Sequence, residues 1–263
     1  MKIKVGTSGF GIAQTKYVQL FSCVEVQHTF YQPPKISTLE RWRAGAPPRF
    51  EFVLKAWQLI THDAKSPTYR RLKKKLTEVE KEEAGYFRPT PIVQEAWQTT
   101  LACAQALHAR TILFQCPASF KQTKENITNL KKFFRKIPSG TPQLNLAWEP
   151  RGDWDPKVVK RICNDLNLWH AVDPFTVQSV TSDKLYFRLH GRNGWRYEYE
   201  ENELRELTAM LVMALEPGPE VGNSIANLSP YIFFNNARMT QDALRFQSIA
   251  DERPTDSVSP FSH

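Results

Sequence analysis

Charged and amide side chains follow short apolar segments along this chain, and their types suit acid–base chemistry. In residues 143–154 (QLNLAWEPRGDW), an apolar segment ends in Glu149 and Arg151. A carboxylate can accept or donate a proton, and a nearby guanidinium can hold an anionic substrate. Parallel α/β proteins present their sites where a hydrophobic strand ends and a helix follows. We therefore expect the functional site at the ends of such segments.

The alternation of apolar and polar residues predicts which side chains face the interior of the sheet. In the predicted strand 24–31, Val24 and Val26 should face the surrounding helices, which turns Glu25 and Gln27 inward. The same reasoning applied to every predicted strand assigns acid–base roles to Glu149, Glu25, Lys55 and Asp173. It assigns substrate binding to Thr7, Gln27, Gln115, Arg151, Arg188 and Asn235, with His190 and Asn236 beside them.

Charges inside a barrel must be compensated, because an unpaired buried charge is costly. We expect three carboxylates to be held by three cations, namely Glu25, Glu149 and Asp173 by Lys55, Arg151 and Arg188. An alternative is that these residues only pair with one another as a closed plug in the interior. Polar residues on most strands favour a site, since barrel interiors are usually filled by branched apolar side chains.

A metal site is a second interpretation of the same cluster. Its candidate ligands are His62, His190, Glu25, Glu149 and Asp173. No His-x-His or His-x-x-x-His spacing occurs, and the cluster holds as many cations as carboxylates, which opposes a divalent ion. We therefore expect no metal ligands, and the sequence indicates no particular cofactor.

Nucleic-acid binding is a third interpretation, suggested by a net charge of +8. The positive charges concentrate in residues 69–75 (YRRLKKK) and 131–136 (KKFFRK), for which solvated helix faces are the favoured interpretation. Three aromatic residues, Trp195, Tyr197 and Tyr199, could stack on a sugar or base or fold back over the rim. The chain carries no Gly-rich phosphate loop, nucleophile elbow or dinucleotide fingerprint.

The elements that must position these residues alternate regularly between strand and helix. Strands are predicted at residues 3–8, 24–31, 50–57, 111–117, 144–149, 168–174, 184–191 and 231–236. Helices are predicted at 16–22, 37–44, 91–109, 123–136, 156–166, 202–215 and 241–250, and Ser37 with Glu40 suggests a capping box. Eight strands joined by helices predict a TIM (β/α)8 barrel.

The barrel should be one domain over residues 1–250, with a flexible tail at 251–263. Residues 58–90 form a charged excursion after the third strand, helical at 69–83. The chain shows no apolar run of membrane-spanning length and no secretory signal, so no membrane partner is expected. Its four cysteines lie far apart among apolar neighbours, which predicts reduced thiols and a cytoplasmic location.

Seven motifs in order together resemble one family. They are GTSG (6–9), VEVQHTFY (24–31), ITH (60–62), FQCPASF (114–120), WEPRGDW (148–154), FRLHG (187–191) and FFNN (233–236). The chain is similar across residues 2–246 to the domain of unknown function 72 family. The resemblance implies a TIM barrel in the neighbourhood of xylose-isomerase-like and endonuclease-IV-like barrels, and no established activity. It also adds Tyr31 and His62 to the expected substrate-binding residues. Gln27 departs from the family, in which Asn is more usual.

The favoured function is an enzyme of hydrolase or isomerase type, with Glu149 central to acid–base chemistry on a sugar-like or phosphate-bearing substrate. Its ligand would be a small anionic or polyhydroxylated molecule. The alternative is a nucleic-acid-binding or DNA-repair-associated protein resembling endonuclease-IV-like barrels, in which a metal could take part.

Overall fold

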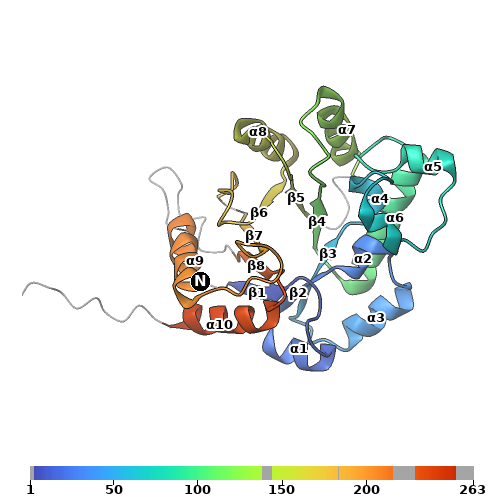
Figure 1. The fold of residues 1–263 in the computed structure, drawn as a ribbon. Helices are drawn as coiled ribbons and strands as arrows, with labels where there is room; N and C mark the ends of the chain where they lie inside the picture. The colour runs from blue at the N-terminus through green and yellow to red at the C-terminus, as the bar shows by residue number, and fades with distance from the viewer. Residues whose placement is uncertain (1–2, 138–143, 183, 216–228, 253–263) are drawn as a thin grey trace, which may run out of the picture.

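Short parallel strands lie at the centre of the molecule, and helices surround them (Figure 1). The computed structural model describes residues 3–137, 144–182, 184–215 and 229–252. Within these residues eight strands form one sheet in the order β1-β8-β7-β6-β5-β4-β3-β2. A parallel bridge between Ser8 and Glu25 joins the two ends of this order, so the sheet is nearly closed. The predicted TIM barrel is confirmed.

The strands are short, as is usual for this fold. They are β1 (Lys4–Thr7), β2 (Cys23–Val26), β3 (Glu51–Lys55), β4 (Thr111–Gln115), β5 (Asn145–Glu149), β6 (Trp169–Val172), β7 (Tyr186–Leu189) and β8 (Tyr231–Phe234). The helices are α1 (Gln14–Leu20), α2 (His28–Tyr31), α3 (Ile36–Ala44), α4 (Gln58–Thr61), α5 (Glu78–Glu83), α6 (Pro91–Leu107), α7 (Lys124–Arg135), α8 (Pro156–Leu166), α9 (Glu201–Leu215) and α10 (Met239–Asp251), with a 3₁₀ helix η1 (Pro67–Arg71). None of the helices in the described ranges is long and apolar enough to cross a bilayer.

The two faces of the sheet bury different side chains, as the alternation predicts. Val24, Phe52 and Trp148 belong to the large apolar layer between strands and helices. A second, smaller cluster fills the barrel interior with Cys23, Val53, Leu113, Ala147, Ala171, Tyr186, Tyr231 and Phe233. The interior is therefore packed, and polar groups lie at both ends of it: Lys4, Glu51 and the Tyr231 hydroxyl interact at the amino ends of the strands, and the predicted polar residues lie at the carboxyl ends.

Tyr17 of α1 ties together the seam between β1 and β2. Its hydroxyl accepts a hydrogen bond from the Thr7 backbone N–H at 2.8 Å and donates one to the Cys23 carbonyl at 3.1 Å. The Tyr17 side chain is fully buried. One phenol thus replaces part of the strand pairing at the seam, where the Ser8–Glu25 bridge is the one backbone bridge between the two edges among the residues that the structure describes.

The second strand is shorter than predicted. It ends at Val26, and residues 28–31 form α2. The Thr29 hydroxyl lies 3.0 Å from the Val26 carbonyl and 2.7 Å from the Lys55 carbonyl. These side-chain contacts offer the backbone carbonyls an alternative to a continued ladder, so the chain turns into a helix. The predicted strand over residues 27–31 is therefore wrong.

The charged excursion is present, but its middle is not the predicted helix over residues 69–83. The middle of the excursion consists of η1, a connecting segment and α5. Leu72 and Thr77, at the two ends of the connecting segment, have β-region dihedrals. Thr77 and Glu80 form a capping box that starts α5. The capping box expected at Ser37 is wrong, because α3 begins one residue earlier, after Lys35. The expected tail and the loop before β8 fall mainly on residues 253–263 and 216–228, outside the described residues.

Replacing Tyr17 by Phe should lower the free energy of unfolding by about 1–3 kcal/mol, because the buried Thr7 N–H loses its acceptor. Urea denaturation followed by circular dichroism measures this change. Tyr31→Phe is a matched control, since in the described part of the chain the Tyr31 hydroxyl makes no hydrogen bond. Equal stability of the two variants would contradict the role of Tyr17 at the seam.

Candidate active site at the carboxyl ends of the strands

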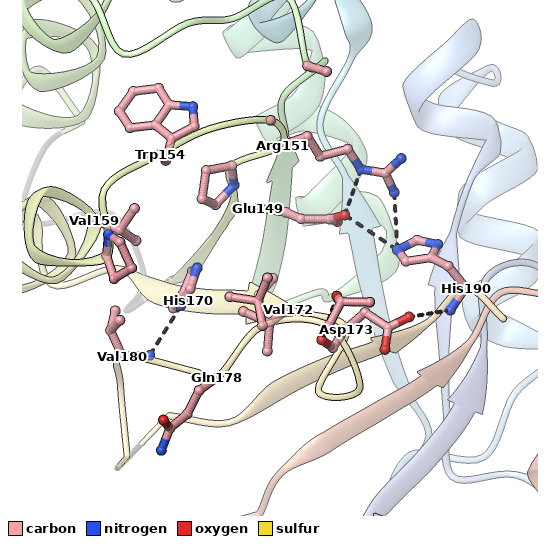
Figure 2. A pocket seen from close by; sticks show the side chains of 17 residues that line it. Glu149, Arg151, Trp154, Val159, His170, Val172, Asp173, Gln178, Val180 and His190 are labelled. Carbon is pink, nitrogen blue, oxygen red and sulfur yellow. Dashed lines mark hydrogen bonds and ion pairs between the residues drawn. The ribbon is translucent and has the colours of Figure 1, made fainter. Parts of the chain in front are cut away.

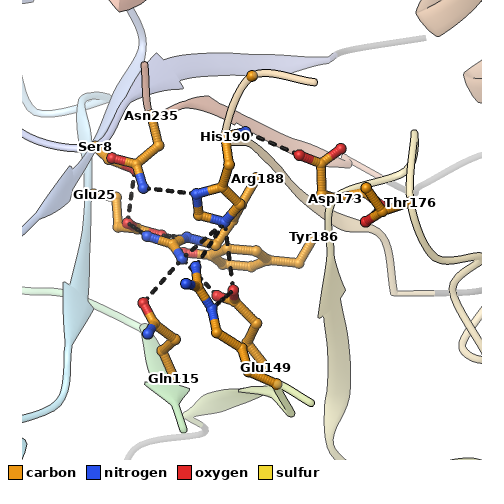
Figure 3. A network of polar contacts seen from close by, with 12 residues as sticks. Ser8, Glu25, Gln115, Glu149, Asp173, Thr176, Tyr186, Arg188, His190 and Asn235 are labelled. Carbon is orange, nitrogen blue, oxygen red and sulfur yellow. Dashed lines mark hydrogen bonds and ion pairs between the residues drawn. The ribbon is translucent and has the colours of Figure 1, made fainter. Parts of the chain in front are cut away.

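A buried guanidinium, that of Arg188 at the end of β7, organises the polar cluster (Figure 3). Its Nε and Nη2 donate to the two carboxylate oxygens of Glu25 at 3.0 and 2.8 Å. Its Nη1 donates to Glu149 Oε2 at 2.5 Å and to Gln115 Oε1 at 3.3 Å. One arginine thus connects β2, β4, β5 and β7 at the same end of the barrel.

Glu25 is enclosed by donors. The Tyr186 hydroxyl donates to Glu25 Oε2 at 2.6 Å, and the Ser8 hydroxyl donates to Oε1 at 2.9 Å. The Gln27 amide also donates to Oε1. Glu25 and Arg188 are both fully buried. A carboxylate with this many donors is held in place as an ion and has no free lone pair for a substrate.

Glu149 reaches from the same network to the surface of the site. Its Oε1 accepts from Arg151 Nε at 2.9 Å and lies 3.4 Å from His190 Nε2. The Arg151 side chain is 40% exposed and the His190 side chain 26% exposed, against 7% for Glu149. Asn235 Nδ2 lies 3.0 Å from His190 Nδ1. Arg151 and His190 are therefore the groups that a solute meets first.

The two central carboxylates are ionised. Burial alone would raise the pKa of Glu25, but Arg188 outweighs it and holds this pKa below its usual value. Burial opposes ionisation of Glu149 in the same way, and Arg188 together with Arg151 and His190 brings its pKa well below the usual value. Both groups are consequently anions at neutral pH.

Lys55, at the end of β3, has a different environment. It is 5% exposed, and its ammonium nitrogen lies 3.8 Å from the centre of the Phe30 ring. Burial, followed by repulsion from Arg188, lowers the pKa of Lys55 to about 7, although Glu25 and Glu149 oppose this shift. Beside it, burial and the Lys55 charge lower the pKa of His62 to about 3. The protonation of Lys55 therefore changes near neutral pH.

The sequence predicted that a cation holds Asp173, but in the described ranges backbone N–H groups hold it instead. Its carboxylate accepts from the backbone N–H groups of His190 at 2.9 Å and Phe175 at 3.1 Å. It therefore fixes the turn after β6 against the end of β7. Backbone N–H groups can stabilise a carboxylate as effectively as a cation can. The sequence alone therefore could not show which of these partners Asp173 has.

Several other predicted residues lie near the cluster without joining it. Thr7 contacts Tyr17 and Gly9, and the Asn236 amide donates to the Tyr197 carbonyl and to Asp242. The Tyr31 ring lies 3.5 Å from the guanidinium of Arg71. These positions indicate structural roles in supporting the rim.

A pocket of about 460 Å³ opens beside Glu149, Arg151 and His190 (Figure 2). It lies between the segment after β5, β6 and the segment after β6, and His170 and Asp173 also line it. The prediction from the sequence did not include His170, because the alternation of side chains along β6 turns it away from the barrel interior. Ser8 and Tyr186 were also missed, since a hydroxyl in an apolar strand gives no sequence signal of a carboxylate partner.

The remaining candidate features are placed as follows. Across the described ranges, no group of three or more His, Cys, Asp and Glu side chains is arranged to hold a metal ion. In the basic segment 69–75, Lys74 forms ion pairs with Glu80 and Glu95. Among the loop aromatics, Trp195 is 65% exposed, whereas Tyr199 is buried against Phe234.

Comparison with known proteins finds a family match and similar folds. A family described as "Protein of unknown function DUF72" matches residues 14–260. The chain is 23% identical over 225 residues to the UPF0759 protein YunF of Bacillus subtilis. The aligned region covers 72% of this chain and 71% of that protein. A DUF72 family protein of Enterococcus faecalis superimposes with a TM-score of 0.71 at 18% identity, covering 99% of each chain. One from Thermotoga maritima gives 0.68 at 22% identity over 96% of this chain and 100% of that one.

Stability should fall as the pH drops below 4.5, the usual value for Glu, because Glu25 and Glu149 have lower pKa values in the folded state. A lowered folded-state pKa stabilises the protein above that pH, and the contribution disappears as the carboxylate is protonated. Urea denaturation at a series of pH values measures the loss. In Glu149→Gln the loss should be shallower, and an unchanged pH dependence would contradict the assignment.

Proposed function

The chain belongs to the DUF72 family, and we propose that it is an enzyme that binds a small anionic or polyhydroxylated substrate at this face and transfers a proton. One observation carries the proposal: a lysine whose pKa is near neutral pH lies beside the fixed ion network of Arg188, Glu25 and Glu149. Lys55 has a pKa of about 7, which suits a group that must both accept and release a proton.

Glu149 has a different part in this proposal from the one that its sequence motif suggests. A carboxylate whose pKa is well below the usual value is a weak base. Glu149 is better suited to hold Arg151 and His190 in place, through contacts of 2.9 and 3.4 Å. It acts as a positioning residue, and Lys55 is the proton carrier.

Arg151 and His190 supply the binding groups for the substrate. Both are partly exposed, and Arg151 Nη2 lies 3.1 Å from His190 Nε2. An oxyanion that takes the place of this contact can accept hydrogen bonds from Arg151 and, in the tautomer whose Nδ1 accepts from Asn235, from His190 Nε2. A bound anion would also favour the protonated form of Lys55 through its charge. The reactions that fit these groups are hydrolysis and isomerisation, each by acid–base catalysis.

Nucleic-acid binding through the segment 69–75 has weaker support. The ammonium of Lys74 is engaged by two carboxylates, and the Arg71 guanidinium lies over the Tyr31 ring. The two carboxylates pair one of the charges that a phosphate backbone would require, and the ring contact fixes the position of a second. Binding of a short DNA that falls steeply with salt, and that Arg151→Gln leaves unchanged, would favour this alternative.

The Lys55 prediction is tested by NMR titration of ¹³Cε-labelled lysine side chains. One signal should titrate near pH 7, and it should be missing from Lys55→Met, which keeps the length of the side chain. Inorganic phosphate should raise this pKa in the wild type. If no lysine signal titrates between about pH 6 and pH 8, the acid–base role of Lys55 is refuted.

Arg151→Gln should weaken phosphate binding by about tenfold, the effect of losing one charge-assisted hydrogen bond, as measured by isothermal titration calorimetry. Arg238→Gln is the matched control, because Arg238 is an exposed arginine that pairs with Glu198 and does not line the pocket. If both variants bind phosphate as the wild type does, the proposed anion site is wrong.

A further inference from the structure

The pocket beside the ion cluster is charged only at one end. Glu149, Arg151, Asp173 and His190 line that end, and much of the remaining wall is apolar. In Figure 2, Val159 and Val180 lie on the side of the pocket away from Arg151. Its volume of about 460 Å³ lies within the range of small-molecule sites. In the proposed function the substrate anion is bound only at the charged end, by Arg151 and His190, so the apolar part of the pocket has no role in it.

The apolar wall is fixed in place before any ligand binds. Trp154, which lines the pocket, donates from its indole N–H to the Phe120 carbonyl at 3.1 Å. Its ring stacks on Phe120 at 5.7 Å and meets Trp148 edge to face at 5.2 Å. A wall with a preset shape binds a ligand of matching shape with little loss of conformational entropy.

His170 contributes a hydrogen-bond donor to this wall. It is 3% exposed, and its Nδ1 accepts from the Val180 backbone N–H at 3.2 Å. Because Nδ1 accepts, the proton of the neutral ring is on Nε2, and burial keeps the ring neutral by lowering its pKa to about 4. Within the described residues, Nε2 has no hydrogen-bond partner, and this edge of the ring lies away from the Val180 contact (Figure 2).

We propose that this pocket is the subsite for the body of the substrate, which is an anion attached to an apolar ring that carries a hydrogen-bond acceptor. The inference rests on the proposed function, since Arg151 and His190 bind the anion. The ring lies along Trp154 and Val159, and His170 Nε2–H donates to the acceptor. A simple sugar phosphate offers little apolar surface to pack against this wall. An aryl or similar ring is therefore the better fit.

Binding of four probes by calorimetry tests the proposal: methyl phosphate, phenyl phosphate and the 3- and 4-acetyl derivatives of phenyl phosphate. The wild type should bind phenyl phosphate at least tenfold more tightly than methyl phosphate. One acetyl derivative should bind more tightly still, because its carbonyl reaches His170. His170→Asn, which keeps an acceptor for the Val180 N–H, should remove only the advantage of the acetyl group.

Val159→Phe should fill the subsite and remove the advantage of the phenyl group, while methyl phosphate binds as before. Val158→Phe, one residue earlier on α8, is the matched control. Equal binding of methyl and phenyl phosphate by the wild type overturns the subsite, and this comparison requires no variant to fold. If Arg151→Gln leaves methyl phosphate binding unchanged, the proposed anion site fails instead, so the two failures are distinguishable.

Discussion

The pairing of Arg188 with Glu25 and Glu149 is the interaction on which the arrangement of the site depends. Two carboxylates and one guanidinium are buried together, and such a group is stable only when nearly every donor and acceptor is matched. Ser8, Tyr186 and Gln115 provide the additional matches. The result is a rigid anchor at the end of the barrel that joins strands far apart in the sequence.

This anchor explains the different character of the groups around it. With both carboxylates engaged by Arg188, Lys55 has no direct carboxylate contact in the described residues and rests on the face of the Phe30 ring. Its ammonium is therefore destabilised by burial and by the nearby guanidinium. Arg151 and His190, on the outer side of Glu149, remain accessible. A buried ion network, a lysine with a lowered pKa and two accessible polar side chains thus follow from one arrangement.

The seam of the barrel and the site are physically connected. Glu25, which pairs with Arg188, is also the residue that bridges Ser8 across the edges of β1 and β2. Tyr17 completes the same seam from the outside. The carboxylate therefore serves both closure of the sheet and order in the site, so that a change at Glu25 is expected to affect both.

The sequence by itself determined the barrel, the inward positions of Glu25, Lys55, Glu149 and Arg188, and the end of the barrel at which they meet. These follow from the two-residue period of strands and from the common direction of parallel strands, which are local properties. Only the tertiary structure decided how the charges pair, because Arg188 contacts Glu25 across 163 residues of chain. The end of β2 at Val26 and the hydrogen bonds of Asp173 to backbone N–H groups were decided in the same way. The pocket wall at His170 also arises from packing between segments, and no spacing in the sequence specifies a contact of that kind.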